Sequence, residues 1–240
     1  MKILSIGNSF SQDATRYLHR LALSTEINIK VVNLYIGGCS LKTHYYNILE
    51  DSKSYDFEFN GERTGIKVSI KDALMSDEWD FITLQQVSHQ SPKYFTYQPY
   101  LNEIALYIRK YCPHSKIVMH QTWAYEEGSE RLCTELGYEK ASDMFADIEK
   151  SYENASKDIS AFGIIPSGQV FMQALKNGIE KIHRDTFHAS YGIGRYALAL
   201  TWYTFFTGGN PNDVKFNDFD APVVEEEIER VKRTVKEVCF

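Results

Sequence analysis

Two short segments near opposite ends of the chain carry side chains that could act together as a nucleophile and its base. Gly7-Asn8-Ser9-Phe10 follows the apolar run Lys2–Ile6, and Asp185-Thr186-Phe187-His188 precedes an apolar segment that begins near Tyr191. A histidine can take the proton of a serine hydroxyl, while a carboxylate fixes the ring tautomer and stabilises the imidazolium. Ser9, His188 and Asp185 are therefore candidate catalytic residues.

Each segment also has an ordinary structural interpretation. Ser9 could merely cap a helix, because serine is a favoured N-cap residue and Asn8 suits a turn. Asp185 and His188 are three residues apart and could share a solvated turn. Gly7-Asn8-Ser9 could instead cradle the phosphate of a nucleotide or flavin, but that leaves Asp185 and His188 unexplained, and no Gly-x-x-x-x-Gly-Lys-Ser/Thr loop is present.

The segments that must position these residues alternate between extended and helical patterns. Helical spacing follows the first strand over Ala14–Ala22. Five strands separated by helices predict an α/β fold in three layers, with a five-stranded parallel sheet between helices. The expected strands are Lys2–Ile6, Lys30–Leu34, Phe81–Leu84, Lys116–His120 and Ala161–Pro166, and the expected later helices are Tyr100–Tyr111, Tyr138–Ser156, Tyr191–Phe206 and Val223–Val238.

A small β-hairpin is expected between the second and third strands. Tyr55–Asn60 and Ile66–Ile70 flank the turn residues Gly61-Glu62, and we expect this hairpin to leave the main sheet and to contribute to a pocket rim. The chain of 240 residues contains no repeat, low-complexity tract or linker. Residues 1–240 are therefore expected to form a single domain.

Composition narrows the classes of partner. The formal net charge is -6, with acidic and basic residues interspersed, so nucleic acid is not an expected partner. The longest apolar stretch at the start, Ile3–Ile6, is interrupted by Ser5 and runs into a polar turn, too short for a signal-peptide core or a membrane span, which predicts a cytoplasmic protein without membrane partners. The four cysteines and seven histidines show no spacing typical of a metal site, so no metal and no cofactor are expected.

The combination of the two segments resembles the first and last sequence blocks of the SGNH/GDSL hydrolase superfamily. This resemblance implies a flavodoxin-like sheet of five parallel strands, with Ser9 as nucleophile and His188 and Asp185 as its partners. Asn8 replaces the usual Asp and Phe10 the usual Leu, which indicates a divergent branch. The chain is similar to a bacterial Gly-Asn-Ser-Phe group of unknown substrate, also through His120–Tyr125 and His188–Tyr196.

The same resemblance implies an oxyanion hole, formed by backbone N–H groups and a side-chain amide. Ser9 would donate its own N–H group, and Gly38 after the second strand would donate another, although paired glycines are also ordinary in turns. The third strand ends without the family's usual asparagine. Gln85 is the preferred replacement, because its amide carries the same donor on a longer stem, and Gln86 and His89 are the alternatives.

Further residues near the expected strand ends could line a substrate pocket. Trp123 and Tyr125 follow the fourth strand, where aromatic rings could stack on a sugar but could equally be packing. His44 follows the glycine turn, where it could line the pocket or start a surface helix.

The resulting hypothesis is a serine esterase that works through an acyl-enzyme intermediate. Its expected substrate is a small-molecule ester with a small acyl group, and acetyl on a carbohydrate is the first candidate, by analogy with glutamine-bearing carbohydrate esterases of the superfamily. The alternative is a non-catalytic domain on the same fold that binds a small molecule or carbohydrate. The sequence leaves the oligomeric state open.

Overall fold

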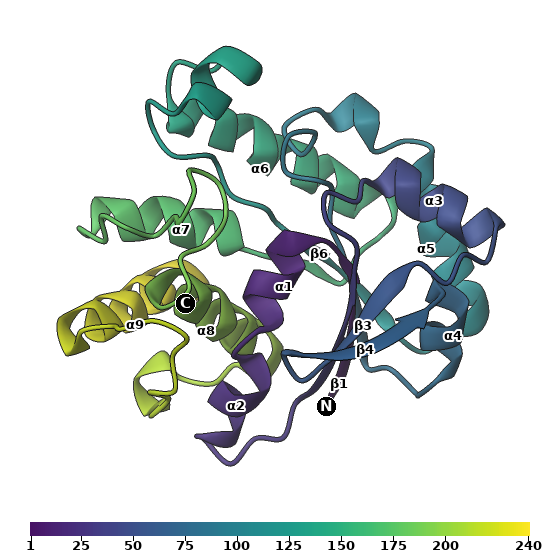
Figure 1. Cartoon of the computed structure of the whole chain (residues 1–240), viewed down its shortest axis with the longest axis horizontal. Helices are drawn as coiled ribbons and strands as arrows, with labels where there is room; N and C mark the ends of the chain where they lie inside the picture. The colour runs from purple at the N-terminus through teal and green to yellow at the C-terminus, as the bar shows by residue number, and fades with distance from the viewer.

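The computed structural model describes residues 1–240 and contains one seven-stranded sheet with the order β4-β3-β2-β1-β5-β6-β7 (Figure 1). Neighbouring strands among β2, β1, β5, β6 and β7 pair in parallel. Their order along the chain is 2-1-3-4-5, as in the flavodoxin-like fold. The strands are β1 (Lys2–Gly7), β2 (Lys30–Tyr35), β3 (Tyr55–Phe59), β4 (Glu62–Val68), β5 (Phe81–Leu84), β6 (Lys116–His120) and β7 (Gly163–Ile165).

The predicted sheet of five parallel strands is too small, because the hairpin belongs to the sheet. Strand β3 pairs antiparallel with β2, and β4 pairs antiparallel with β3. The two strands therefore cover the hydrogen-bonding edge that β2 would otherwise expose. The sheet is mixed, with a parallel five-stranded part and a two-stranded antiparallel extension.

Helices pack on both faces of the sheet (Figure 1). One layer contains α1 (Ser9–Thr15), α2 (Leu18–Leu23), α7 (Ser167–Lys176), α8 (Ile193–Thr207) and α9 (Glu225–Cys239). The other contains α3 (Leu41–Leu49), α4 (Ile70–Met75), α5 (Tyr100–Tyr111) and α6 (Ala141–Asp158). Short helical turns occur at η1 (Tyr94–Thr96), η2 (Arg131–Glu135) and η3 (Pro211–Asp213). No helix combines the length and apolar character needed to cross a membrane.

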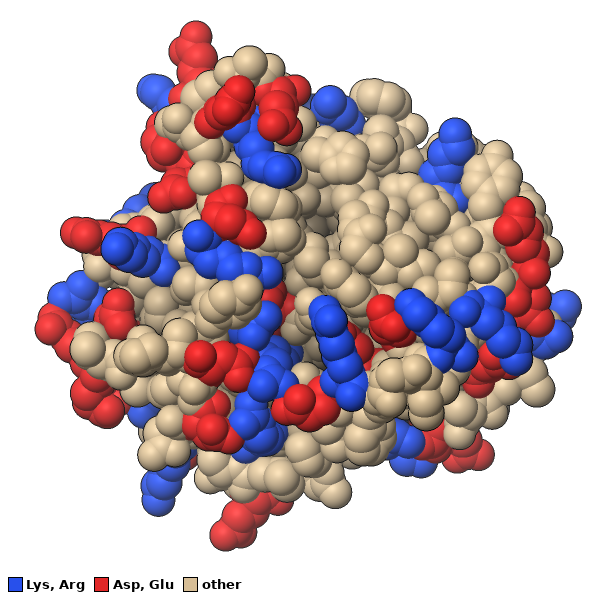
Figure 2. Space-filling view, viewed as in Figure 1, with Lys and Arg blue, Asp and Glu red and all other residues tan.

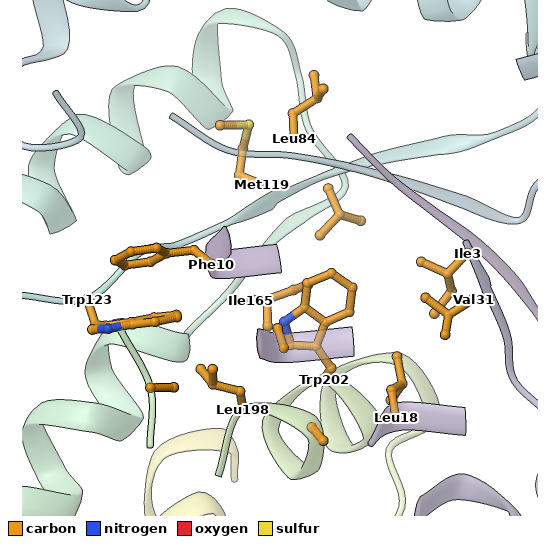
Figure 3. Packing of buried hydrophobic residues seen from close by; sticks show 14 of the residues in the cluster. Ile3, Phe10, Leu18, Val31, Leu84, Met119, Trp123, Ile165, Leu198 and Trp202 are labelled. Carbon is orange, nitrogen blue, oxygen red and sulfur yellow. The ribbon is translucent and has the colours of Figure 1, made fainter. Parts of the chain in front are cut away.

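The core lies between these layers and fixes the start of the chain at its centre. Strand β1 is hydrogen-bonded on both sides, and Ile3, Leu4 and Ile6 are completely buried. Directly after it, the Phe10 ring stacks on Trp123, with the ring centroids 4.0 Å apart (Figure 3). The end of β1 and the start of α1 are thus held from several directions, which gives the residues between them a defined place.

Candidate active site

Ser9 is the first residue of α1, directly after the central strand. The N-cap of this helix is Asn8, whose Oδ1 accepts a hydrogen bond of 3.0 Å from the Phe10 N–H group. Capping is therefore done by the neighbouring asparagine, and the Ser9 hydroxyl is available for another partner. Gly7 is required before it, because a Cβ at that position would lie 2.4 Å from Ser11 Oγ.

The structure brings Ser9, His188 and Asp185 together. His188 Nε2 lies 2.8 Å from Ser9 Oγ, and His188 Nδ1 lies 2.9 Å from Asp185 Oδ2. The backbone N–H of His188 also donates to Asp185 Oδ1 at 2.9 Å, so the carboxylate is held by both the ring and the backbone of the same residue. With Nδ1 donating to the carboxylate, Nε2 can accept the serine proton.

The loop that carries Asp185 and His188 is joined at its base by a β-bridge, and its Asp185 side chain is exposed to solvent. A bridge joins His183 to Ala189, and Thr186 adopts a left-handed conformation with φ 72°. Although partial burial alone would raise it, the pKa of Asp185 is lowered, because the ring and the backbone N–H of His188 both hydrogen-bond the carboxylate. The carboxylate is therefore ionised across the neutral pH range.

Two residues with backbone N–H groups that are free of carbonyl partners line the hollow beside the serine hydroxyl. Ser9 and Gly38 both line it, and no carbonyl of the protein accepts a hydrogen bond from either N–H group. Gly38 has φ +64°, a conformation that favours glycine. These free donors are suited to hold the negative charge that develops on a carbonyl oxygen under attack.

Gln85, the preferred side-chain donor, is placed behind the site. Its amide nitrogen donates to Asn8 Oδ1 at 2.7 Å, and its Oε1 accepts from His120 Nδ1 at 2.7 Å. The side chain is buried and does not line the hollow. Its predicted oxyanion role therefore does not fit this geometry, in which Gln85 fixes the Asn8 cap that frees Ser9.

The two alternatives to Gln85 lie in different places, Gln86 in the interior and His89 at the hollow. Gln86 is completely buried, and its Oε1 accepts hydrogen bonds from the N–H groups of Leu41 and Val87. His89 lines the hollow. Partial burial, with the positive charges of Lys93 and Arg131, lowers the pKa of the His89 ring. Of Gln85, Gln86 and His89, only His89 reaches the hollow, where its neutral ring can donate a hydrogen bond.

Two of the predicted pocket residues lie in the interior. Trp123 is fully buried between Phe10 and Phe171, and its Nε1–H donates to the Phe187 carbonyl at 2.8 Å. His44 is also fully buried, its Nδ1 lies 2.8 Å from the Tyr55 hydroxyl, and burial lowers its pKa to about 3. Neither can contact a ligand in the hollow, because the neighbouring side chains fill the space around them.

The hollow at the serine has a volume of about 580 Å³, and most of the residues that line it are polar or charged. Tyr125 is part of this lining and hydrogen-bonds Ser88 through its hydroxyl, at 2.8 Å. The lining residues are Asn8, Ser9, Gln12, Tyr35, Gly37, Gly38, Val87, Ser88, His89, Tyr125, Arg131, Glu135, Arg184, Phe187 and His188. A larger hollow of about 810 Å³ lies near Lys2 and Asp80, at the start of the strands; His114 and Ser115 line it, but the Ser115 hydroxyl donates to the Trp79 carbonyl at 2.6 Å and not to the histidine.

Three charged residues near the site carry no motif that would have identified them. Asp13, on the serine helix α1, forms an ion pair with Arg184, with 2.9 Å between Asp13 Oδ2 and Arg184 Nη1. Arg131 lies in the hollow, with its guanidinium 4.2 Å from the centre of the Phe187 ring. Helical spacing places Asp13 one turn after Ser9, but this says nothing of its partners. No cluster of His, Cys, Asp and Glu is arranged to hold a metal ion.

Comparison with known proteins places the chain in a family. A family model described as a domain of unknown function, DUF4886, matches residues 2–237. The chain belongs to the DUF4886 family. A DUF4886 protein of known crystal structure, from Bacteroides uniformis, is 31% identical, with a TM-score of 0.92 over 99% of this chain and 94% of that one.

More distant structures share the fold of this DUF4886 chain. A proposed SGNH hydrolase from Slackia heliotrinireducens is 23% identical, with a TM-score of 0.62 over 87% of this chain and 99% of that chain. An acetylxylan esterase from Geobacillus stearothermophilus is 14% identical, with a TM-score of 0.50 over 90% and 94% of the two chains. No curated protein matches the sequence. The fold is therefore that of SGNH/GDSL hydrolases, in agreement with the resemblance of the sequence blocks.

Proposed function

We propose that this DUF4886 protein is a serine esterase of the SGNH type. The observation that supports this most directly is the position of the His188 ring, with Nε2 2.8 Å from Ser9 Oγ and Nδ1 2.9 Å from Asp185. A serine that only capped a helix would not require a histidine at this distance, and the cap is already supplied by Asn8.

The proposed reaction proceeds through an acyl-enzyme. Ser9 Oγ attacks the carbonyl carbon of the ester while its proton passes to His188 Nε2. The N–H groups of Ser9 and Gly38 hold the tetrahedral oxyanion, with His89 as the candidate third donor. The intermediate collapses as His188 protonates the leaving alcohol. Water, deprotonated by His188, then attacks the acyl-enzyme. When this second intermediate collapses, His188 returns the proton to Ser9 Oγ, the carboxylic acid leaves, and both residues are restored.

A small acyl group, acetyl first, on a polar alcohol is the proposed substrate class. The hollow beside Ser9 is lined mostly by polar and charged side chains, which suits a hydroxylated alcohol better than a long lipid chain. The acetylxylan esterase with the same fold acts on an acetylated carbohydrate, and this favours the same kind of substrate here.

A fluorophosphonate probe tests the proposal, because it reacts with an activated serine. We expect wild-type protein to be labelled and to hydrolyse p-nitrophenyl acetate, whereas Ser9→Ala should abolish both. Ser40→Ala is a matched control, since Ser40 caps α3 nearby and has no histidine partner. Wild-type protein that is folded but inert to both reagents would favour the alternative, a non-catalytic domain that binds a small molecule or carbohydrate.

A further inference from the structure

A second charged cluster lies directly behind the proposed triad. Asp13 is on α1, four residues after Ser9, and its side chain has no solvent exposure. A carboxylate in such a place is unfavourable unless it is fully paired. Arg184 Nη1 donates to both of its oxygens, at 3.0 and 2.9 Å, and Arg195 Nε donates to Oδ1 at 2.9 Å.

Arg184 connects this buried carboxylate to the loop that carries the proposed base. Its Nη1 also donates to the Ala189 carbonyl, and its backbone N–H donates to the His188 carbonyl at 3.0 Å. Its Nε lies 3.7 Å from Asp185 Oδ2. One arginine therefore contacts the serine helix, the backbone around the histidine, and the carboxylate that orients the histidine.

The aromatic ring of Tyr191 restricts the two arginines further. The guanidinium carbons of Arg184 and Arg195 lie 4.6 and 4.5 Å from the centre of this ring. Planar guanidinium groups bind aromatic rings and carboxylates with defined geometry, so both side chains have little freedom. The cluster thus joins α1 to the His188 loop through contacts of defined geometry.

We infer that Asp13, acting through Arg184, is a positioning residue that holds His188 and Asp185 against Ser9. The inference rests on the proposed function for its catalytic meaning. The Asp13 side chain does not line the hollow, and its hydrogen-bond partners are Arg184 and Arg195, not a member of the triad. The side chain therefore reaches the histidine loop through Arg184.

Asp13→Asn and Arg184→Gln test this inference, with two measurements for each variant. The first is the rate of fluorophosphonate labelling, which should fall by about 10- to 100-fold, since small displacements of reacting groups have effects of this size. The second is the downfield proton resonance of His188 Nδ1–H, assigned with Asp185→Asn, which should shift or disappear. The double variant should lose no more labelling rate than the stronger single variant, because both act through the same cluster.

Asp77→Asn is the matched control. Asp77 is also a carboxylate held by two cations, with Lys2 Nζ at 2.6 Å and Lys30 Nζ at 2.5 Å, but it lies at the start of the strands, away from Ser9. This variant should unfold at a temperature about 2–4 °C lower. Its labelling rate and its His188 resonance should stay as in the wild type.

The outcomes separate the two proposals. If wild-type protein is not labelled, the esterase proposal fails, while the His188 resonance still tests the positioning role. If folded Asp13→Asn keeps both the wild-type resonance and a labelling rate within about twofold of wild type, the positioning role is wrong. Should Asp13→Asn not fold, Arg184→Gln decides by the same two measurements, because the pair shares one function.

Discussion

At the scale of single residues, the neighbours of Ser9 explain why its hydroxyl is free. Asn8 caps α1, Gln85 holds the Asn8 side chain, and the Asn8 amide group donates to the Cys39 carbonyl at 3.0 Å. This last bond ties the turn after β1 to the turn after β2, which carries Gly38. The two backbone donors of the proposed oxyanion hole are thus fixed relative to one another by one asparagine side chain.

The space around Gly7 is too small for a side chain. In Gly7→Ala the new methyl group would lie 2.4 Å from Ser11 Oγ and 3.1 Å from the Gln85 side chain, so α1 must move. We expect the free energy of unfolding to fall by about 1–3 kcal/mol, as for other overpacked sites. Fluorophosphonate labelling should slow as well, because Ser9 lies on the displaced turn. Chemical denaturation and labelling kinetics measure both effects.

Gly38→Ala provides the comparison for Gly7→Ala. Here nothing lies within 4 Å of the added methyl group, but the φ of +64° is unfavourable for alanine by about 1–2 kcal/mol. The loss of stability should therefore come from backbone strain alone and should be the smaller of the two. A larger loss for Gly38→Ala than for Gly7→Ala would contradict this assignment.

At the scale of elements, the sequence patterns locate the parallel strands well. Strands β5 and β6 and helix α5 begin and end at the predicted residues, because their apolar spacing is regular and their ends are polar. The single helix expected over Ala14–Ala22 is instead divided between α1 and α2. The hairpin of β3 and β4 joins the sheet, contrary to expectation, since no local pattern reveals which edge a strand will join.

The site was predictable where roles depend on local order and less so where they depend on side-chain direction. Ser9, Asp185 and His188 follow from two short segments, and the structure brings them together. Gln85 and Trp123 also follow strands, but both turn inward to partners that are remote in the chain, at Asn8 and Phe187. Direction depends on such long-range hydrogen bonds, which residue spacing does not encode.

A prediction at this scale concerns the contact between β6 and the His188 loop. Trp123→Phe removes the hydrogen bond from Nε1–H to the Phe187 carbonyl while keeping an aromatic ring next to Phe10. We expect a loss of about 1–3 kcal/mol in the free energy of unfolding, because the partly buried Phe187 carbonyl loses its donor and a smaller ring fills the place of Trp123. Faster amide hydrogen exchange over residues 183–190 and slower fluorophosphonate labelling should accompany it.

Trp202→Phe is the control for this contact. Trp202 is equally buried, on α8, but its Nε1 has no hydrogen-bond partner, so the substitution changes volume without removing a bond. It should lower stability without a change in exchange over residues 183–190. Equal exchange in the two variants would show that the hydrogen bond does not restrain the loop.

At the scale of the whole molecule, charged residues connect parts that are far apart in sequence. Figure 2 shows acidic and basic side chains interspersed over one face, with no large area of a single sign. Asp220 makes two such connections. It binds Arg16, at the end of α1, at 2.8 Å, and Arg195 of α8 at 2.6 Å. The segment after α8 is thereby held to the beginning of the chain.

The pH dependence of stability tests this connection. Hydrogen bonds from Arg16 above all, with those from Arg195, lower the pKa of Asp220 from 3.8 to about 2. A carboxylate with a lowered pKa stabilises the fold above its unfolded pKa, and this contribution disappears as the pH falls through the folded value. Asp220→Asn should therefore lower the free energy of unfolding by about 1–2 kcal/mol at pH 7, after allowance for solvent screening. The difference should become smaller as the pH falls from 4 toward 2.

Thermal unfolding of wild-type protein and Asp220→Asn at pH 7 and at pH 3 measures the effect. Asp218→Asn serves as the control, because Asp218 pairs with Arg20 but is 69% exposed, and such pairs contribute little. A difference between wild type and Asp220→Asn that is the same at pH 7 and at pH 3 would contradict the assignment.

The separation of Ser9 and His188 by 179 residues has a consequence for biosynthesis. A ribosome that adds about 5–20 residues per second makes Ser9 roughly 10–35 s before it makes His188. During that interval the nascent polypeptide holds a serine that has no group to take its proton. The pair can assemble only after His188 has been made, so translation products that stop before it cannot carry out the proposed ester hydrolysis.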